Sequence, residues 1–421
     1  MARTDNLGNF LTDVATAIKN KTGASGTILA YNFDTEINNI STGGPISQPK
    51  KDVNFYDFDG TRLYSYTKTE FLALEQLPAN PSHTGLTAQG WNWSLASAKS
   101  YVTTYGELAI GQMYITSDGA TKLHISITDD SRLEIPICFT QSATNGIEVD
   151  WGDGSTPETF SSASSSSPVT PTHQYATKGD YVISLKSIVN NCTLMLGAND
   201  SSYCVMGKYA TSVDGGRYFA SLLKRVDIGN NLTIFRTYAF RFCTGLKYVT
   251  MPSTVTAISS YAFGDCCALQ ILILPSGMTQ LSSNAFSECR SLETLVISSA
   301  MATIQSDTFY NTYSLQEMYL PEQMTSLSQR LFYYAYAISK LIVPKTVTYI
   351  YSTAFGYCNS LKVVDFSNHT AVPTLASYQA FTTCATDYVI VVPDALYETW
   401  KTTSQWSQIA SHIVSVSNYS S

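Results

Sequence analysis

Apolar residues recur with a fixed period over much of the second half of the chain. Phenylalanines mark it most clearly, six of them spaced by 23 residues and a seventh following after 26: Phe240, Phe263, Phe286, Phe309, Phe332, Phe355 and Phe381. Apolar residues also return six, nine and eleven positions after each of the first six phenylalanines. Because residues two apart on a strand face the same side, each unit is predicted to hold one short strand whose apolar side points inward. No unit can bury its apolar stripe alone, so the pattern predicts stacked coils.

The details of this repeat resemble the BspA-like branch of leucine-rich-repeat proteins. Most units open with Ala-Phe, and a proline often follows the strand, where the missing N–H ends pairing. A small residue stands three positions after each phenylalanine: Cys243, Cys266, Cys289, Thr312, Ala335, Cys358 and Cys384. A period of 20 to 29 residues with this pattern is typical of a leucine-rich-repeat solenoid. The resemblance implies a solenoid over residues 217–393, in a branch often found on bacterial and protist surface proteins.

The outward positions of the predicted strands are unusually aliphatic. They include Ile271, Ile273, Val296 and Ile342. A row of such side chains over several coils would form a larger apolar patch than monomers normally expose. We expect either that the return path of each coil covers this row or that it binds a partner.

Residues 1–42 carry a different apolar period, typical of an amphipathic helix. The stripe at helical spacing consists of Leu7, Phe10, Leu11, Val14 and Ile18. It is too polar for a secretory signal, and we expect it to mediate assembly, against the next domain or other copies of the chain. The opening, from Met1 to Ala15, resembles tail-associated proteins of phages and prophages of Gram-positive gut bacteria. That resemblance implies an anchor in a larger assembly.

Two β-rich regions are predicted between this segment and the solenoid. A linker over 43–52 leads to a small module over 53–120, which opens with a hairpin at Asp59-Gly60 and resembles the Listeria–Bacteroides repeat. Alternating strands follow over 121–197, where Trp151-Gly152-Asp153-Gly154 and His173-Gln174-Tyr175 resemble the PKD β-sandwich. Both resemblances imply spacers.

The chain ends in a pattern that predicts a lid. A connector over 198–216 precedes the solenoid, and after it residues 394–421 place Leu396 and Trp400 on one helical face, followed by Trp406. An open solenoid exposes its last coil, which such a segment can cover. The predicted fold class is therefore mainly β with short helices (α+β), in a multidomain chain.

Composition and charge exclude several classes of function. The 421 residues carry a net charge of −7 with only 14% charged residues and no basic run, which argues against nucleic-acid binding. No apolar segment approaches the ~18 residues of a membrane span, so we expect no membrane insertion. The histidines are scattered, and no phosphate loop, nucleophile elbow or zinc motif appears. We predict no catalytic residue, no cofactor and no metal, and hence no enzyme.

The cysteines and two aspartates give weaker evidence about packing and metal binding. Five of the nine cysteines share one register of successive coils, which favours reduced packing side chains over disulfides or a metal site. Cys267 is the candidate for an exposed thiol. Asp150 and Asp153 could hold a cation, but turn capping is the favoured interpretation.

Tyrosine, with 28 copies, is the outlier of the composition. Tyrosine contributes a large contact area at little entropic cost, and its hydroxyl can bond to sugars or backbone groups. The predicted ligand-binding residues are those clustered within about two coils: Tyr310, Tyr313, Tyr319, Tyr333, Tyr334, Tyr336 and Tyr357. A ladder of stacked rings that seals the coils is the alternative, and both roles are compatible.

Together these patterns predict a modular adhesin that does not transform its ligand. The preferred setting is a phage or prophage tail, as a receptor-binding or fibre protein in the virion, recognising a bacterial surface glycan or protein. It would contact other tail proteins through residues 1–42 and form a homo-oligomer there, with a trimer favoured. The alternative is a bacterial cell-surface or secreted BspA-like adhesin that binds host protein or glycan. A structural virion protein that recognises no host ranks third among these interpretations, and an enzyme ranks last.

Overall fold

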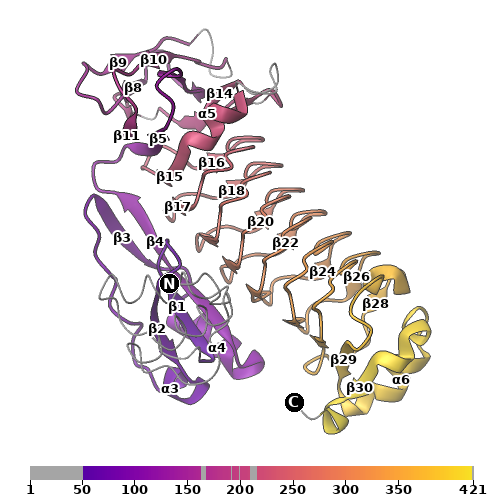
Figure 1. Ribbon diagram of the computed structural model, residues 1–421. Helices are drawn as coiled ribbons and strands as arrows, with labels where there is room; N and C mark the ends of the chain where they lie inside the picture. The colour runs from indigo at the N-terminus through magenta and orange to yellow at the C-terminus, as the bar shows by residue number, and fades with distance from the viewer. Residues whose placement is uncertain (1–50, 163–166, 191, 199, 209–215, 420–421) are drawn as a thin grey trace, which may run out of the picture. The chain divides into compact units, whose positions relative to one another are not determined.

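A computed structural model describes residues 51–162, 167–190, 192–198, 200–208 and 216–419 (Figure 1). The chain divides into two units, residues 1–51 and 52–421, and the second is described below. The predicted assembly residues Leu7, Phe10, Leu11, Val14 and Ile18 lie outside the described residues. Among the described residues, no helix has the length and apolar character needed to cross a bilayer.

The second unit begins with a small mixed module, called the front module below. Its sheet has the order β2-β1-β4-β3, with β1 parallel to β4 and the two outer pairs antiparallel. Phe55 lies at the centre of its core, 4.8 Å from Trp91 between ring centroids. Thr67 and Ser94 cap the two helices with their side chains, which sets where each helix begins. The elements are β1 (Val53–Tyr56), β2 (Arg62–Tyr66), α3 (Lys68–Leu72), β3 (Leu86–Trp91), α4 (Leu95–Tyr105) and β4 (Leu108–Thr116).

The next region is continuous with the solenoid rather than a spacer before it. Its strands join a six-stranded sheet of order β17-β15-β5-β11-β8-β9, in which the first coils supply β15 and β17. Buried apolar residues form one cluster from Leu123 to Ile413, so this region acts as the N-terminal cap of the stack. The elements are β5 (Thr121–Ile127), β6 (Glu134–Pro136), β7 (Phe139–Gln141), β8 (Ile147–Asp150), β9 (Glu158–Thr159), β10 (Thr172–Gln174), β11 (Gly179–Ser187), β12 (Leu194–Leu196), β13 (Tyr203–Cys204), β14 (Gly207–Lys208) and α5 (Gly216–Leu222).

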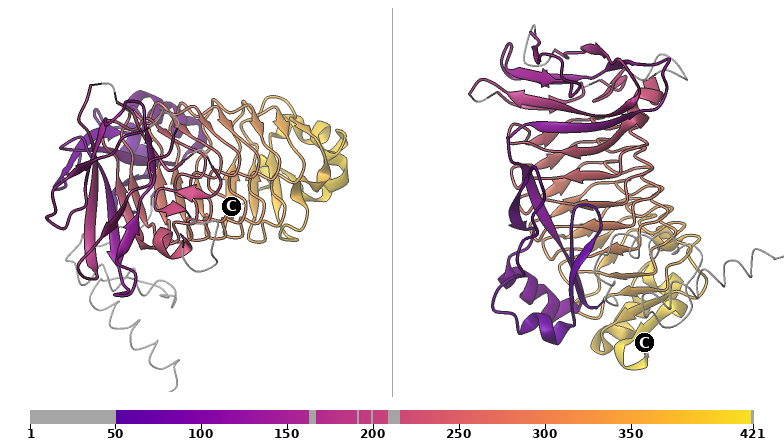
Figure 2. Two further views of the ribbon diagram at one scale, coloured as in Figure 1. Left: turned by 90° about the horizontal axis from the view of Figure 1, so that it is seen from above. Right: turned by 60° about the vertical axis from the view of Figure 1, so that its left-hand side comes forward.

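The coils of the solenoid stack in one row, as Figure 2 shows from two directions. Each coil carries a front strand, placed eight to ten residues after its phenylalanine, and a shorter return strand. The front strands are β15 (Leu223–Asp227), β17 (Tyr248–Thr250), β19 (Ile271–Ile273), β21 (Thr294–Val296), β23 (Glu317–Met318), β25 (Lys340–Ile342), β27 (Val363–Asp365) and β29 (Val389–Val392). The return strands are β16 (Ile234–Phe235), β18 (Ala257–Ile258), β20 (Gln280–Leu281), β22 (Thr303–Ile304), β24 (Ser326–Leu327), β26 (Tyr349–Ile350) and β28 (Thr374–Leu375). All pairs between neighbouring coils are parallel.

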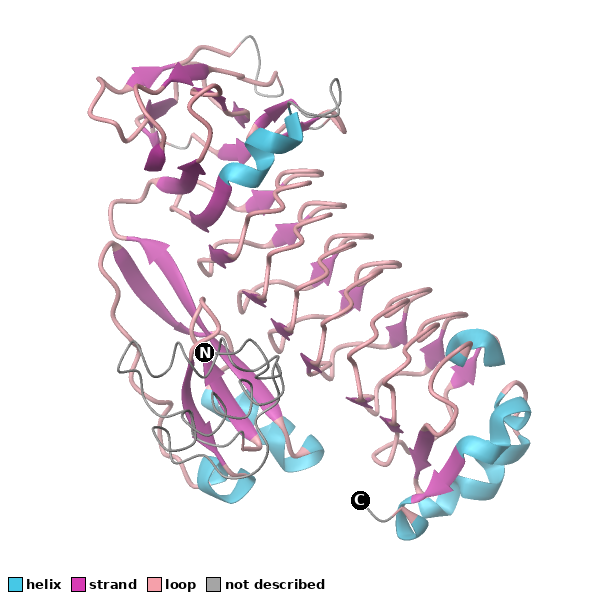
Figure 3. Ribbon diagram, viewed as in Figure 1, coloured by secondary structure: helices cyan, strands magenta, loops and turns pink. Residues whose placement is uncertain are grey.

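The seven periodic phenylalanines form one continuous ladder inside this stack. Each ring stacks on the next, with centroid distances of 5.1, 5.5, 6.1, 5.7, 5.7 and 5.0 Å from Phe240 to Phe381. The first six are at most 1% exposed, and Phe381 is 5% exposed. The predicted array is confirmed, and the fold is mainly β with short helices in the described residues (Figure 3).

The cysteine register has a packing role with a specific hydrogen bond. The thiols of Cys266, Cys289, Cys358 and Cys384 each donate to the carbonyl oxygen of the phenylalanine one coil earlier, at 3.0 to 3.1 Å. Of the five cysteines in this register, Cys243, Cys266, Cys289 and Cys358 are buried and Cys384 is partly buried, which matches the packing role predicted for them. Cys267 is only partly exposed, and burial raises the pKa of its thiol.

The last coil is closed by η3 (Asp394–Leu396), α6 (Tyr397–Thr402), η4 (Trp406–His412), β30 (Ile413–Ser415) and η5 (Val416–Asn418). Trp400 and Trp406 are fully buried, and both contact Phe366, which directly follows β27. Strand β30 extends the front sheet by pairing in parallel with β29. The apolar end of the stack is thereby covered.

Candidate functional site

The aliphatic row on the front strands is covered by the front module. Ile271, Ile273 and Val296 are at most 4% exposed and form a buried cluster with Tyr56 and Ala109 of the module. The expectation that the return path covers this row is wrong, and so is the expectation that the module is a spacer. The physical reason is the same in both cases: the module supplies the apolar surface that the row needs for burial.

Hydrogen bonds between the front module and the solenoid repeat at the 23-residue interval of the coils. Three side chains of the module donate to backbone carbonyls at equivalent positions of three successive coils, each 23 residues apart. The bonds run from Asn92 Nδ2 to Leu274 O at 3.0 Å, from Trp93 Nε1 to Ile297 O at 2.7 Å, and from Tyr101 OH to Leu320 O at 2.9 Å. Buried carbonyls at the ends of the front strands are thereby satisfied.

A small charged cluster lies at the same interface. Tyr56 OH donates to Glu317 at 2.9 Å, and Tyr319 OH donates to the same carboxylate at 3.2 Å. Burial, and next the negative charge of Glu317, raise the pKa of both tyrosines far above the usual tyrosine range. At the interface edge Lys340 pairs with Glu107 at 2.9 Å. Tyr319 therefore serves the contact with the module and lies apart from the other six predicted ligand-binding tyrosines.

Gly111 of the front module lies close against the side chain of Ile273 across this interface. The close approach leads to a prediction about stability. A Cβ at this position would lie 2.6 Å from Ile273 Cγ1 and 2.9 Å from Cδ1. We expect Gly111→Ala to lower the free energy of unfolding by about 1–3 kcal/mol, because extra volume in a packed interface forces side chains apart. Urea unfolding followed by intrinsic fluorescence measures it.

The matched control is Gly111→Ala in an Ile273→Ala background, where the obstructing side chain is gone. There the glycine substitution should cost almost nothing, so the two changes should be non-additive. Additive losses would show that Gly111 and Ile273 do not meet, and would contradict the docked arrangement.

Six of the predicted tyrosines do come together and form what we call the tyrosine patch: Tyr310, Tyr313, Tyr333, Tyr334, Tyr336 and Tyr357. Rings in equivalent positions stack, with Tyr310 5.8 Å from Tyr333 and Tyr313 5.0 Å from Tyr336. Tyr334 joins the two rows, 4.7 Å from Tyr333 and 5.8 Å from Tyr336. The rings thus form the stacked ladder, and each remains partly exposed.

The turn geometry presents these side chains outward. Tyr334 and Tyr357 stand two residues after their phenylalanines with φ of 63° and 61°, and Asn311 has the same conformation one coil earlier. Their N–H groups donate to the neighbouring coil, as in the 3.0 Å bond from Tyr334 N to Gly356 O. These intercoil bonds hold a left-handed conformation that a bulky residue rarely adopts.

The patch is electrically neutral. Its charged neighbours are paired in place, Arg290 with Glu288 at 3.0 Å and Arg330 with Asp307 at 2.7 Å. Burial, and next the neighbouring Tyr357, raise the pKa of Tyr333, and burial and Tyr334 raise that of Tyr310. The hydroxyls of Tyr333 and Tyr310 therefore remain donors, on a surface suited to hydrogen bonding and ring contact rather than ion pairing.

The predicted ligand-binding set leaves out the three most exposed tyrosines of the described residues, although Tyr349 and Tyr351 belong to the same cluster in the sequence. Tyr349, Tyr351 and Tyr378 are 36%, 45% and 47% exposed. The signal that could have singled out Tyr349 and Tyr351 is their position on either side of the buried Ile350, since neighbouring residues of a strand point to opposite sides.

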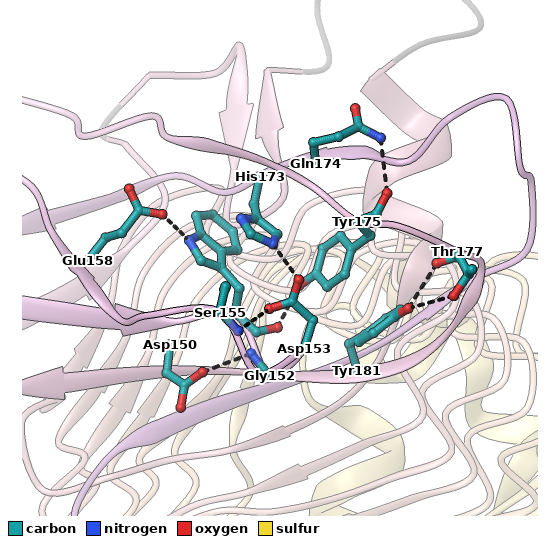
Figure 4. Close-up of polar contacts among 11 residues, drawn as sticks. Asp150, Gly152, Asp153, Ser155, Glu158, His173, Gln174, Tyr175, Thr177 and Tyr181 are labelled. Carbon is teal, nitrogen blue, oxygen red and sulfur yellow. Dashed lines mark hydrogen bonds and ion pairs between the residues drawn. The ribbon is translucent and has the colours of Figure 1, made fainter.

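The Trp-Gly-Asp-Gly turn holds a polar cluster that is satisfied internally (Figure 4). Asp150 accepts a hydrogen bond from Gly152 N at 2.9 Å, while Asp153 accepts from Ser155 N at 3.0 Å and pairs with His173 at 2.8 Å. The Ser155 hydrogen bond, and next that of His173, hold the pKa of Asp153 well below its usual range. Gly152 has φ of 77°, and a Cβ there would meet the carbonyl oxygen of Val182.

These bonds show the turn-capping role that the sequence favoured for both aspartates.

Two further histidines pair with an aspartate at 2.7 Å, His83 with Asp57 and His124 with Asp227. Within the described parts of the chain, no group of three or more His, Cys, Asp or Glu side chains is arranged to hold a metal ion.

Comparison with known families identifies the repeat. Residues 215–339 and 325–403 match the family model described as BspA type Leucine rich repeat region, with 6 copies. The solenoid is a BspA-type leucine-rich-repeat region. No PKD or phage-tail family is among the matches, and no curated protein sequence matches the chain.

Several solved leucine-rich-repeat structures are similar to this chain. A leucine-rich repeat protein from Bacteroides ovatus is 22% identical with a TM-score of 0.38, over 42% of this chain and 44% of that one. A leucine rich cell surface protein from Faecalibacterium prausnitzii is 21% identical with a TM-score of 0.26, over 46% and 64%. Pneumococcal vaccine antigen PcpA is 18% identical with a TM-score of 0.35, over 44% and 42%. The match thus spans less than half of the Bacteroides protein.

Proposed function

We propose that this protein is a non-catalytic adhesin at the surface of a bacterium or secreted from it, and that it binds host protein or glycan through the tyrosine patch. Proteins with BspA-type leucine-rich repeats are typically binding proteins without catalysis. The proposed setting is the cell surface, and the similar protein from Faecalibacterium prausnitzii is named a cell surface protein.

The observation that carries this proposal is the burial of the front strands. The front module occupies the aliphatic row at Ile271, Ile273 and Val296, so this part of the front strands is closed to a ligand. The tyrosine patch is a preformed aromatic surface whose rings are already ordered by stacking, so that little side-chain entropy remains to be lost on binding. Its neutral charge balance favours recognition by ring contact and hydroxyl bonds.

The phage-tail setting rests on residues 1–42, which lie outside the described residues. The same holds for the predicted homo-oligomer, a trimer, and for contacts with other tail proteins through Leu7, Phe10, Leu11, Val14 and Ile18. These remain predictions from the sequence, and the matched repeat family favours the cell-surface setting.

The test is binding of the labelled full chain to cultured epithelial cells, compared with its Tyr313/Tyr336→Ala variant. We expect the variant to bind at least about tenfold more weakly, since truncation of two central aromatic contacts typically removes more than 1.4 kcal/mol. The matched control is Tyr238/Tyr261→Ala, another stacked pair, 5.7 Å apart, in the first coils.

Both variants lose one stacked ring pair beside an arginine, so they should lose similar stability and differ only in binding. Thermal unfolding of all three proteins checks this point. Cell binding by the Tyr313/Tyr336→Ala variant at the level of the unchanged chain would refute the tyrosine patch as the recognition surface.

A further inference from the structure

The return strands form a second outer surface, which we call the return face. It consists of the outward residues of β16, β18, β20, β22, β24, β26 and β28 together with their flanking residues. The inward residue of each strand, such as Leu281, Ile304 or Leu327, is at most 4% exposed and belongs to the core. The outward residues do not contribute to that core. Their composition is therefore set by the solvent or ligand that this surface contacts.

This face carries no charged side chain over six successive coils. The stretches without any Asp, Glu, Lys or Arg are 253–260, 276–283, 299–306, 323–329, 346–353 and 371–379. Serine, threonine and glutamine fill most of their outward positions, and Gln280, Thr303, Thr325, Thr348 and Thr374 are all exposed. Protein surfaces ordinarily keep charged residues on such faces for solubility, so a charge-free face of this extent calls for a ligand.

The backbone makes this face regular. The return strands form two parallel sheets, of order β16-β18-β20-β22 and β24-β26-β28, and within the second sheet successive coils are joined by hydrogen bonds such as Thr348 N to Thr325 O at 2.9 Å and Thr374 N to Thr348 O at 2.9 Å. Parallel strands lie about 4.8 Å apart, so hydroxyl groups repeat at that interval along the stack. The face therefore offers donors and acceptors in rows that follow the solenoid axis.

Two exposed tyrosines flank the inward residue of β26 on this face, and a third begins the 3-10 helix η2 (Tyr378–Phe381) that follows β28. Tyr349 and Tyr351 flank the buried Ile350, and their rings are 4.7 Å apart at an interplanar angle of 57°. Tyr378 follows on the next coil, three residues after Leu375, the strand partner of Ile350. At 36–47% exposure these rings contribute little to the core and keep apolar surface in contact with water. Exposed aromatic side chains among uncharged polar groups mark a binding surface.

We propose that the return face binds an uncharged, extended polysaccharide that lies along the stacking direction of the coils. A neutral sugar chain exchanges hydroxyl bonds with serine, threonine and glutamine, and its apolar C–H surfaces pack on the tyrosine rings. Anionic polymers and nucleic acids depend on Lys and Arg contacts, which this face does not offer. The site and its ligand are independent of the tyrosine patch and go beyond the proposed recognition of host cells.

The experiment is affinity electrophoresis and pull-down of the full chain with neutral polysaccharides, namely galactomannan, amorphous cellulose and chitin, beside polygalacturonate and heparin as charged polymers. We expect binding to at least one neutral polymer, no binding to the charged ones, and no weakening at high salt, because no ion pair contributes. Tyr349/Tyr351/Tyr378→Ala should weaken the binding by at least about tenfold.

Two further variants keep the test decisive. Thr325→Glu places a charge in the middle of the face without touching the core and should also weaken binding, whereas Tyr313/Tyr336→Ala should bind the polymer as the unchanged chain does. The proposal is overturned if no neutral polymer binds, or if the triple tyrosine variant binds equally well while remaining folded. Light scattering that shows a dimer of the full chain, dispersed by Thr325→Glu, would assign the face to self-association instead.

Discussion

Replacing Phe286 by alanine is expected to lower the free energy of unfolding by about 3–5 kcal/mol, the usual cost of truncating a fully buried phenylalanine. Its ring is completely buried between Phe263 at 5.5 Å and Phe309 at 6.1 Å, so the substitution opens a cavity in the middle of the ladder. The coils on either side are held in register by the paired strands and by intercoil hydrogen bonds such as Phe286 N to Thr308 O at 3.1 Å, so they cannot rearrange to fill it. Urea unfolding monitored by circular dichroism measures the loss.

The control is Tyr310→Ala, which removes a ring of similar size from the next coil. Tyr310 also stacks, 5.8 Å from Tyr333, but it lies at the surface, so we expect a loss of only about 1 kcal/mol. Equal losses for the two variants would mean that the phenylalanine ladder contributes no more than the surface ladder, and would contradict the continuous core described above.

The second large effect is expected at the lid. Trp406→Ala should cost about 3–5 kcal/mol and make the chain prone to aggregation. The indole is fully buried, 5.4 Å from Trp400 and 5.7 Å from Phe366 between ring centroids, and its Nε1 donates to Pro373 O at 2.8 Å. Its loss exposes the apolar end of the last coil and loosens β30, which covers the edge of the front sheet. Thermal unfolding with light scattering measures both consequences.

A phenylalanine at this position separates packing from hydrogen bonding. Trp406→Phe keeps most of the apolar contact but leaves the Pro373 carbonyl unpaired, so about 1–3 kcal/mol should be lost without aggregation. Tyr397→Ala is the milder control: its ring packs against the core from the partly exposed side of the lid, so we expect a smaller loss of stability than for Trp406→Ala and no aggregation. Aggregation by Tyr397→Ala to the same degree as by Trp406→Ala would show that the tryptophan is not what closes the stack.

The burial of the front strands changes where a ligand of this solenoid can bind. With Ile271, Ile273 and Val296 under the front module, two other surfaces are candidates for ligand binding, namely the turns with the tyrosine patch and the return face. The two differ in chemistry, since paired charges surround the patch, whereas the return face has no charged residue from β18 to β28. The two binding experiments can therefore fail or succeed separately.

The sequence by itself determined the solenoid. The interval of 23 residues from Phe240 to Phe355 repeats the same apolar frame in every coil, and a repeat contacts mainly its neighbours, so local pattern is enough to predict both the strands and the stack. The same holds for the buried cysteines, whose small side chains recur in one register, and for the stacking of Tyr313 on Tyr336, one period apart.

Only the tertiary structure decided what lies over the coils. The contact of Asn92 with Leu274, or of Gly111 with Ile273, joins residues more than 160 positions apart, and no periodicity in either segment specifies the other. For that reason the sequence could show that the front row was too apolar for water but not that the front module covers it. The exposure of Tyr349, Tyr351 and Tyr378 likewise depends on how the described elements pack around them, which is a property of the tertiary structure and not of their own sequence.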